Sequence, residues 1–189
     1  MTPRTGSPGQ VTVPHQVRFL RQPHPEYPHL TVWGIQIGGT DLRVLVAQAT
    51  RELWARELDD DDDTPEEREA FLLRQHAPLY FADEARARAH FQGDAQPGLR
   101  HQGSGALFLL GCPCGIDACW PLLATVTRTE QTITWGAFHQ PCRPEWGELP
   151  LGPYTFLRAP YEASLAAPHH HAADPLAASS RRTACGDTQ

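Results

Sequence analysis

Residues 106–142 decide the fold, and they read ALFLLGCPCGIDACWPLLATVTRTEQTITWGAFHQPC. The first five of these residues are apolar and predict a buried strand. Further along, residues 122–128 and 132–138 are rich in β-branched and aromatic side chains and flank the short polar segment 129–131. This pattern is typical of a β-hairpin. We therefore predict an antiparallel sheet, with a cluster of cysteines between its first strand and the hairpin.

The segment before this stretch predicts one further strand and one helix. Residues 30–37, LTVWGIQI, are β-branched and aromatic and end at Gly38-Gly39, which is typical of a strand followed by a turn. We expect Thr40 to cap a helix that begins at Asp41. One face of this helix is apolar and should pack on the sheet. The residues of that face are Leu42, Leu45, Val46, Ala49 and Leu53.

Shorter signals predict the remaining elements. Thr64-Pro65-Glu66-Glu67 has the residues of a capping box with proline at the first helical position, which predicts a helix to about Gln75. Residues 82–91 indicate a short third helix, residues 154–157 an edge strand, and residues 160–166 a final helical turn or two. The sequence thus predicts an α+β fold: a small antiparallel sheet with a C-terminal hairpin, two or three helices packed on it, and a cysteine knot.

Composition divides the chain into three parts. Residues 1–29 contain six prolines and little apolar periodicity, and we expect them to form a disordered arm. Residues 30–166 contain the predicted elements and should form a single α+β domain, long enough to bury a core of its own. Residues 167–189 are small and polar and predict a disordered tail, in which His169-His170-His171 is a solvated tract.

Charge and hydropathy exclude several classes of protein. The formal net charge is -6, and nine acidic residues lie within residues 57–69, so nucleic acid is an unlikely partner. We expect no membrane contact, because no apolar stretch reaches the roughly 18 to 20 residues that a membrane helix needs. The first ten residues, MTPRTGSPGQ, lack the apolar core of a secretory signal, which favours a cytoplasmic location with reduced thiols.

Three cysteines lie within eight residues, at Cys112, Cys114 and Cys119. Thiolates are the soft ligands that zinc prefers, and a closed structural site needs a fourth nitrogen or sulfur ligand. If the hairpin turn centres on Glu130, Cys119 lies opposite Pro141 and therefore beside Cys142. We predict a structural zinc site formed by Cys112, Cys114, Cys119 and Cys142, with His139 as the alternative fourth ligand.

Other interpretations of the cysteines stay open, because the C-x-C-x4-C spacing differs from the C-x2-C pairs of zinc fingers. The thiols can be free, or they can hold an iron–sulfur cluster. In a further alternative, Cys112, Cys114 and Cys119 serve a thiol-based redox enzyme or sensor through a reversible disulfide.

The rest of the sequence favours a binding role over catalysis. It contains no phosphate loop, dinucleotide-binding fingerprint, H-E-x-x-H or G-x-S-x-G motif, so we expect that the chain is not an enzyme. We predict a protein-binding module, in which the aromatic-rich C-terminal half contacts an unidentified protein partner. The aromatic residues concerned are Trp120, Trp135, Phe138, Trp146, Tyr154 and Phe156. Packing in a core is the default interpretation of these residues, and a binding surface that they form with Arg143 or Arg158 is the alternative.

The stretch CPCGIDACWPL at 112–122, together with TITW at 132–135 and FHQP at 138–141, resembles a group of small uncharacterised bacterial proteins. The shared features are a C-x-C-G-x3-C-W-P-L motif, a hairpin ending in a tryptophan strand, and a downstream G-P-x-x-F segment with a tyrosine. Here that segment is Gly152-Pro153-Tyr154-Thr155-Phe156, followed by Tyr161. The resemblance covers roughly residues 30–166 and implies a shared fold, with no established activity or substrate.

Overall fold

A computed structural model describes residues 13–24, 27, 29–58, 63–94 and 105–176 of the chain. Its first sheet is built on two long strands, β1 (Val17–Pro23) and β2 (Thr31–Ile37), which pair antiparallel along their full length. Two short strands, β3 (Thr40–Asp41) and β4 (Leu79–Phe81), pair with opposite ends of β2. A further short strand, β9 (His169–His170), lies parallel to β1 on its free side.

The second sheet contains the predicted hairpin and has the order β5-β6-β7-β8. Its strands are β5 (Leu107–Leu110), β6 (Leu122–Arg128), β7 (Thr132–His139) and β8 (Tyr154–Leu157). All its pairs are antiparallel, and the hairpin turn is closed by the Thr129 N–H, which donates to the Thr132 carbonyl at 2.9 Å. The hairpin and the edge strand at residues 154–157 are therefore confirmed.

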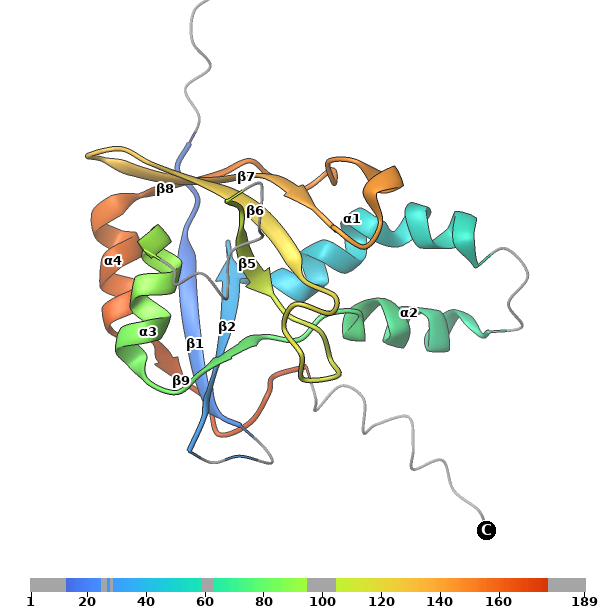
Figure 1. Cartoon of the computed structure of the whole chain (residues 1–189), viewed down its shortest axis with the longest axis horizontal. Coiled ribbons are helices and arrows are strands. Elements are labelled where there is room, and N and C mark those ends of the chain that lie inside the picture. Colours follow the sequence, from blue (N-terminus) through green and yellow to red (C-terminus); the bar gives the residue numbers. More distant parts are fainter. Residues whose placement is uncertain (1–12, 25–26, 28, 59–62, 95–104, 177–189) are drawn as a thin grey trace, which may run out of the picture.

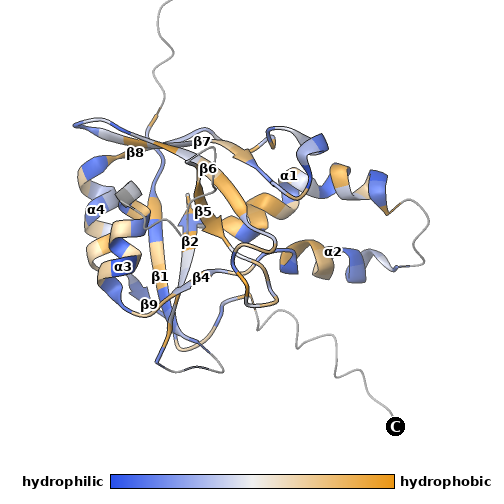
Figure 2. Cartoon of the chain, in the orientation of Figure 1, coloured by the Kyte–Doolittle hydropathy of each residue, from blue (hydrophilic) through white to orange (hydrophobic). Residues whose placement is uncertain are grey.

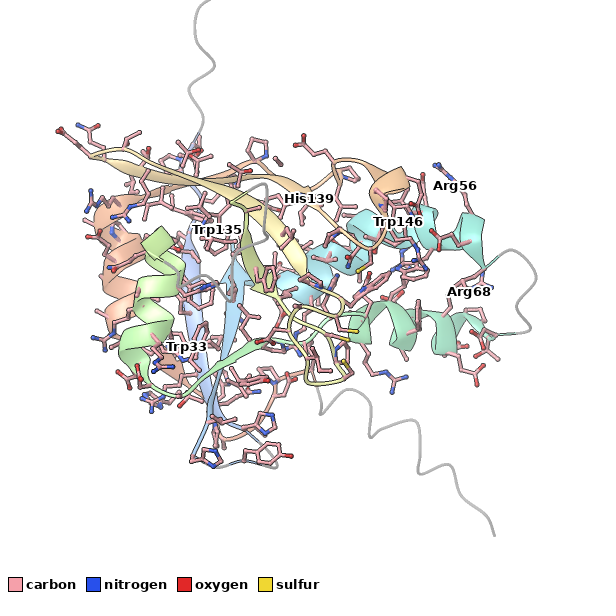
Figure 3. All side chains as sticks on the ribbon, viewed as in Figure 1. Trp33, Arg56, Arg68, Trp135, His139 and Trp146 are labelled. Atoms are coloured by element: carbon pink, nitrogen blue, oxygen red, sulfur yellow. The ribbon has the colours of Figure 1, made fainter. Side chains whose placement is uncertain are left out.

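Two backbone bridges join the sheets at their ends. His15, just before β1, bridges Phe156 of β8, and Ala77, just before β4, bridges Gly111 at the end of β5. The main core contains large aromatic side chains from both sheets and from the helices beside them. Those that are fully buried are Phe19, Trp33, Phe91, Trp135, Phe138, Phe156 and Tyr161. Figure 3 shows Trp33 on the first sheet and Trp135 on the second, both within this region.

The helices flank the sheets at two ends of the molecule (Figure 1). One end has α1 (Leu42–Glu57) and α2 (Pro65–Arg74), and the other has α3 (Glu84–Ala89), its continuation η1 (His90–Asp94) and α4 (Arg158–Ala166). A short 3-10 helix, η3 (Pro144–Trp146), follows the second sheet's third strand. Figure 2 shows that the apolar residues follow the strands and the inner faces of the helices. This arrangement confirms the α+β class. In the described part of the chain, no helix is both long enough and apolar enough to cross a bilayer.

The N-terminal caps of α1 and α2 are polar side chains, as predicted, but the cap of α1 is one residue later than expected. The predicted capping box is present at Thr64, whose hydroxyl accepts from the Glu67 N–H while the Glu67 carboxylate accepts from the Thr64 N–H. At α1 the cap is Asp41, whose carboxylate accepts from the Arg43 N–H at 2.9 Å. We expected Thr40 to be the cap, but Thr40 pairs with Ile37 in β3, so the helix begins one residue later.

The expected N-terminal arm is partly wrong. We expected residues 1–29 to be disordered, but Val17–Pro23 forms β1, in the interior of the first sheet. Phe19 and Leu20 are both buried because this strand is covered on both faces, so its sequence shows no alternation of apolar and polar residues. The prolines Pro14 and Pro23 lie before the strand and at its last position, where a missing N–H disturbs the ladder least. Residues 1–12 lie outside the described part of the chain.

The expected disordered tail is also partly wrong. Residues 169–170 form β9, and the His171 N–H donates to the Arg21 carbonyl at 2.9 Å. Asp174 accepts two hydrogen bonds from the buried guanidinium of Arg43, at 2.7 and 2.8 Å. Because a buried guanidinium needs an anionic partner, this contact holds the segment after β9 against the start of α1. The remaining tail residues, 177–189, lie outside the described part of the chain.

Candidate metal centre

Three cysteine sulfurs meet in the loop between β5 and β6. We call residues 111–121 the cysteine loop. The Sγ atoms of Cys112, Cys114 and Cys119 all lie within 4.8 Å of one another. Two tight turns produce this convergence: the Gly115 N–H donates to the Cys112 carbonyl at 3.1 Å, and the Cys119 N–H donates to the Ile116 carbonyl at 2.9 Å. Gly115 has a φ of 85°, which favours glycine, so the first turn depends on this residue.

The cysteine loop is fixed to the segment 76–80 that leads into β4. Ala77 and Gly111 exchange two backbone hydrogen bonds, of 3.0 and 2.8 Å. The Tyr80 hydroxyl donates to the Gly115 carbonyl at 2.7 Å, and Nδ1 of the buried His76 lies 3.1 Å from the Trp120 carbonyl oxygen. The loop position is therefore set by the protein itself, before any ion binds.

A second close contact at Gly111 shows how tightly the loop folds back on itself. A Cβ atom at Gly111 would lie 2.4 Å from Asp117 Oδ1 and 3.2 Å from Asp117 Cα. A larger residue at this position would displace the Asp117 carboxylate and crowd its backbone, so glycine leaves the space that Asp117 occupies. The half-buried Asp117 side chain packs against Gly111, and its partial burial raises the pKa of the carboxylate to about 6.

The thiols differ in acidity. Burial raises the pKa of the Cys112 thiol to about 11, whereas a hydrogen bond from Cys112 lowers the pKa of the exposed Cys114 thiol. A hydrogen bond to the charged form of a group favours that form, so Cys114 is the more readily ionised of the two. Three convergent sulfurs of which one ionises readily are suited to a thiophilic cation, which displaces the remaining thiol protons when it binds.

Of the two predicted fourth ligands, Cys142 contacts the cysteine loop directly. Its thiol donates to the Cys119 carbonyl at 3.2 Å. In the observed hairpin Thr127 lies opposite Thr134, which differs from the expected register by one residue. A bulge between Leu123 and Thr125 shifts the register by one further residue. Cys142 still arrives beside Cys119. Its sulfur is outside the group of three in the described residues, so its role as a ligand stays a prediction.

His139, the alternative, has a different environment. It pairs with Leu123 within the second sheet, and its Nδ1 lies 2.8 Å from the Ala137 carbonyl oxygen. This local contact occupies one ring nitrogen of His139, and no hydrogen bond among the described residues joins His139 to the cysteine loop. The geometry therefore favours Cys142 over His139.

Sequence reasoning missed a cluster that holds the two cysteine-bearing segments together. We call Trp54, Glu57, Trp120, Arg143 and Trp146 the tryptophan cluster. The guanidinium of Arg143 lies 5.6 Å from the ring centroid of Trp54 and 5.0 Å from that of Trp120. Glu57 accepts hydrogen bonds from Arg143 Nε at 3.0 Å and from Trp146 Nε1 at 2.6 Å. Trp120 follows Cys119 and Arg143 follows Cys142, so the cluster keeps these cysteines adjacent.

The aromatic residues proposed for a binding face divide into two groups. Trp135, Phe138 and Phe156 are fully buried in the main core, so the expectation that they form a partner surface is wrong for these three. Their rings are taken up by packing against Tyr154, Phe156 and Tyr161. Trp120 and Trp146 are half-buried in the tryptophan cluster, and Tyr154 is half-buried beside the core.

Comparisons of the chain with protein-family models, with curated proteins and with solved structures find no match. The resemblance carried by the C-x-C-G-x3-C-W-P-L stretch therefore stays a prediction.

Proposed function

We propose that the cysteine loop is a structural zinc site with Cys112, Cys114, Cys119 and Cys142 as ligands, within a cytoplasmic protein-binding module. The observation that carries the proposal is the convergence of three sulfurs within 4.8 Å, on a loop that the fold already fixes. A fourth sulfur, that of Cys142, lies against the backbone of Cys119. Structural zinc is commonly bound by four cysteine thiolates in a tetrahedral arrangement.

The loop has a physical need for such an ion. Its sulfurs face solvent or are half-buried, and its one large aliphatic side chain, Ile116, is 64% exposed. Apart from Trp120, which packs in the tryptophan cluster, little apolar surface holds the loop closed, and hydrogen bonds exposed to water contribute little. A bound metal would supply the missing free energy, because the unfolded chain has no preformed site and the binding free energy becomes folding free energy.

For the partner we propose a protein rather than a nucleic acid. The net charge of -6 opposes contact with phosphates. Because three of the predicted aromatics are in the core, the candidate contact surface is the end of the molecule that carries the cysteine loop. Ile116 is exposed on this loop, and the partly exposed Phe71 packs against Trp54 nearby. Exposed apolar side chains that a helix and a neighbouring loop present at one end of the molecule are suited to contact with another protein.

The first test measures metal content by native mass spectrometry and elemental analysis on the full chain, purified without added metal. We expect one zinc per chain. Cys114→Ser should lose the zinc and lower the melting temperature, while Cys185→Ser, a control outside the cluster, should keep both. A chain with H169N, H170N and H171N together excludes adventitious binding by the histidine tract and should also keep its zinc. Metal-free wild-type protein, or equal zinc in Cys114→Ser, would overturn the proposal.

The acidity of the thiols supports a second candidate, a redox function. Cys114 is exposed, and a hydrogen bond from the Cys112 thiol lowers its pKa. Exposure and a lowered pKa are features of reactive cysteines. Oxidation of two of these thiols to a disulfide releases two electrons and two protons to an oxidant such as a peroxide. This function predicts no bound metal and fast alkylation of one thiol in the native protein. Uniformly slow alkylation would exclude it.

A further inference from the structure

A cavity of about 610 Å³ lies beside the cysteine loop, on one face of the first sheet. Strand register forms its floor: Gln22 of β1 pairs with Val32 of β2, and Val32 pairs with Tyr80 of β4. Directly opposed residues in a sheet project from the same face, so these three side chains form one row across three strands. The volume is in the range of natural small-molecule sites.

Two segments from distant parts of the chain form the walls. One wall is the cysteine loop, which contributes Cys112, Pro113 and Asp117 and is held by the Tyr80 hydroxyl and the Ala77–Gly111 bridge. The other is the segment 172–174, which the Arg43–Asp174 pair holds in place. Arg43 is 6% exposed and also pairs with Asp41, so this wall rests on a buried charge network rather than on a loose tail.

Two polar side chains in the cavity have no hydrogen-bond partner among the residues that the structure describes. Gln22 is 8% exposed, and no residue in the described ranges donates to its side-chain amide or accepts from it. Asp117 is half-buried and, within those same ranges, its carboxylate has neither a hydrogen bond nor an ion pair. Among the other polar groups of the lining, the Tyr80 hydroxyl donates to the Gly115 carbonyl, Asp174 accepts from Arg43, and His24 Nδ1 accepts from the Tyr27 N–H. The amide of Gln22 and the carboxylate of Asp117 both line the cavity, so they are the polar groups with which a ligand in this cavity would pair.

The charge of the surroundings selects the kind of ligand. Asp117 contributes a negative charge, and the nearby Arg43 is outnumbered by its partners Asp41 and Asp174. Among the described residues that line the cavity, His24 alone can carry a positive charge. The remaining lining is largely apolar, with Pro23, Val32, Ala77, Pro78 and Pro113. A cation with an apolar body fits this combination, and an anion does not.

We propose that this cavity binds a small organic amine, whose ammonium group donates to Asp117 and whose apolar body lies over Val32 and Pro78. The amide of Gln22 would pair with a second polar group of the ligand. The site goes beyond the proposed zinc site, because neither Asp117 nor Gln22 is among the proposed metal ligands. Binding of the amine and binding of zinc can therefore fail separately.

The experiment titrates the full chain with 2-phenylethylamine and, in parallel, with 3-phenylpropionate, which has a similar body and the opposite charge. Binding is followed by saturation-transfer and chemical-shift changes in NMR spectra. We expect the amine to bind and the carboxylate not to bind. Asp117→Asn, which removes the charge and keeps the shape, should weaken amine binding about tenfold or more. Glu130→Gln, which removes an exposed carboxylate from the hairpin turn, should leave it unchanged.

A second pair of variants keeps the test valid if Asp117→Asn does not fold. Ala173 is exposed and lines the cavity, so Ala173→Trp should fill it and abolish amine binding. Ala167→Trp, at an exposed position outside the lining, should bind the amine like wild type. Zinc content is measured on every variant. Equal binding of amine and carboxylate, or unchanged amine binding in Asp117→Asn and Ala173→Trp, would overturn the proposal, and retained zinc in those variants would leave the metal site intact.

Discussion

Between the two sheets, Trp135, Phe156 and Tyr161 are fully buried and pack ring against ring, whereas in the cysteine loop Cys114 and Ile116 face solvent. The Tyr161 hydroxyl even finds a buried acceptor, the Phe91 carbonyl at 2.7 Å. The main core is thus stabilised by removal of apolar surface from water, a large term that needs no other component.

The cysteine loop is held by interactions of a different kind. They are a backbone bridge to Ala77, single hydrogen bonds to His76 and Tyr80, and the stacking of Arg143 in the tryptophan cluster. Each of these contributes on the order of 1 kcal/mol or less. The core can therefore fold without a metal ion. The fold sets the position of the cysteine loop, but only weak interactions keep the loop closed. This is the region in which a metal ion has most to add.

The largest expected effect comes from the core. Trp135→Ala should lower the free energy of unfolding by about 3–5 kcal/mol, because it removes a fully buried ring and leaves a cavity. Leu157→Ala, at a side chain that is 47% exposed on the neighbouring strand, should lower it by less than about 1 kcal/mol. Urea unfolding of the three proteins measures both. If Trp135→Ala loses no more than Leu157→Ala, the sheet interface does not supply the stability assigned to it.

A smaller effect tests a contact of the loop through its pH dependence. His76 is buried, and burial lowers its pKa from 6.5 to about 4. The unfolded chain therefore binds a proton at His76 that the folded chain does not. The stability from neutral His76 is complete above pH 6.5 and is lost as the pH falls from 6.5 towards 4. Between pH 7 and pH 5 the loss is about 2 kcal/mol.

His76→Gln isolates this contribution. The variant keeps an amide donor near the Trp120 carbonyl but has no titrating group. Urea unfolding of both proteins at pH 7 and pH 5 should show the stability advantage of wild type falling by about 2 kcal/mol at the lower pH. Asp117, whose raised pKa of about 6 acts in the opposite direction, is present in both chains and cancels in the difference. An advantage that is the same at both pH values would contradict the prediction.

Features that depend on residues close together in the chain could be predicted from the sequence, whereas those that depend on distant contacts could not. The hairpin at 122–139, the capping box at Thr64 and the convergence of three cysteines depend on residues within a few positions of one another. Local rules reach such features because the atoms that interact are close in the chain. Strand β1 was missed because it is covered on both faces and because prolines surround it.

The features that sequence analysis missed near the site depend on contacts between distant residues. Glu57 of α1 binds Trp146, Arg43 binds Asp174, and Gln22 reaches the cavity through its register with Val32. Each of these residues has an ordinary local context, a helix end or a strand end. No spacing rule identifies the partner, so the tryptophan cluster and the cavity walls emerge only from the tertiary structure.

The smallest expected effect tests the tryptophan cluster itself. Arg143→Lys keeps the positive charge but removes the planar guanidinium that lies over two indole rings and donates to Glu57. It should lower the free energy of unfolding by about 0.5–1 kcal/mol, measured by urea unfolding. Arg51→Lys is the matched control, because the Arg51–Glu69 pair is exposed and has no aromatic partner among the described residues, so its loss should be close to zero. Equal effects in the two variants would mean that stacking contributes nothing. A larger loss in Arg143→Lys, together with faster removal of zinc by a chelator, would show that the cluster holds Cys119 and Cys142 in position for the metal.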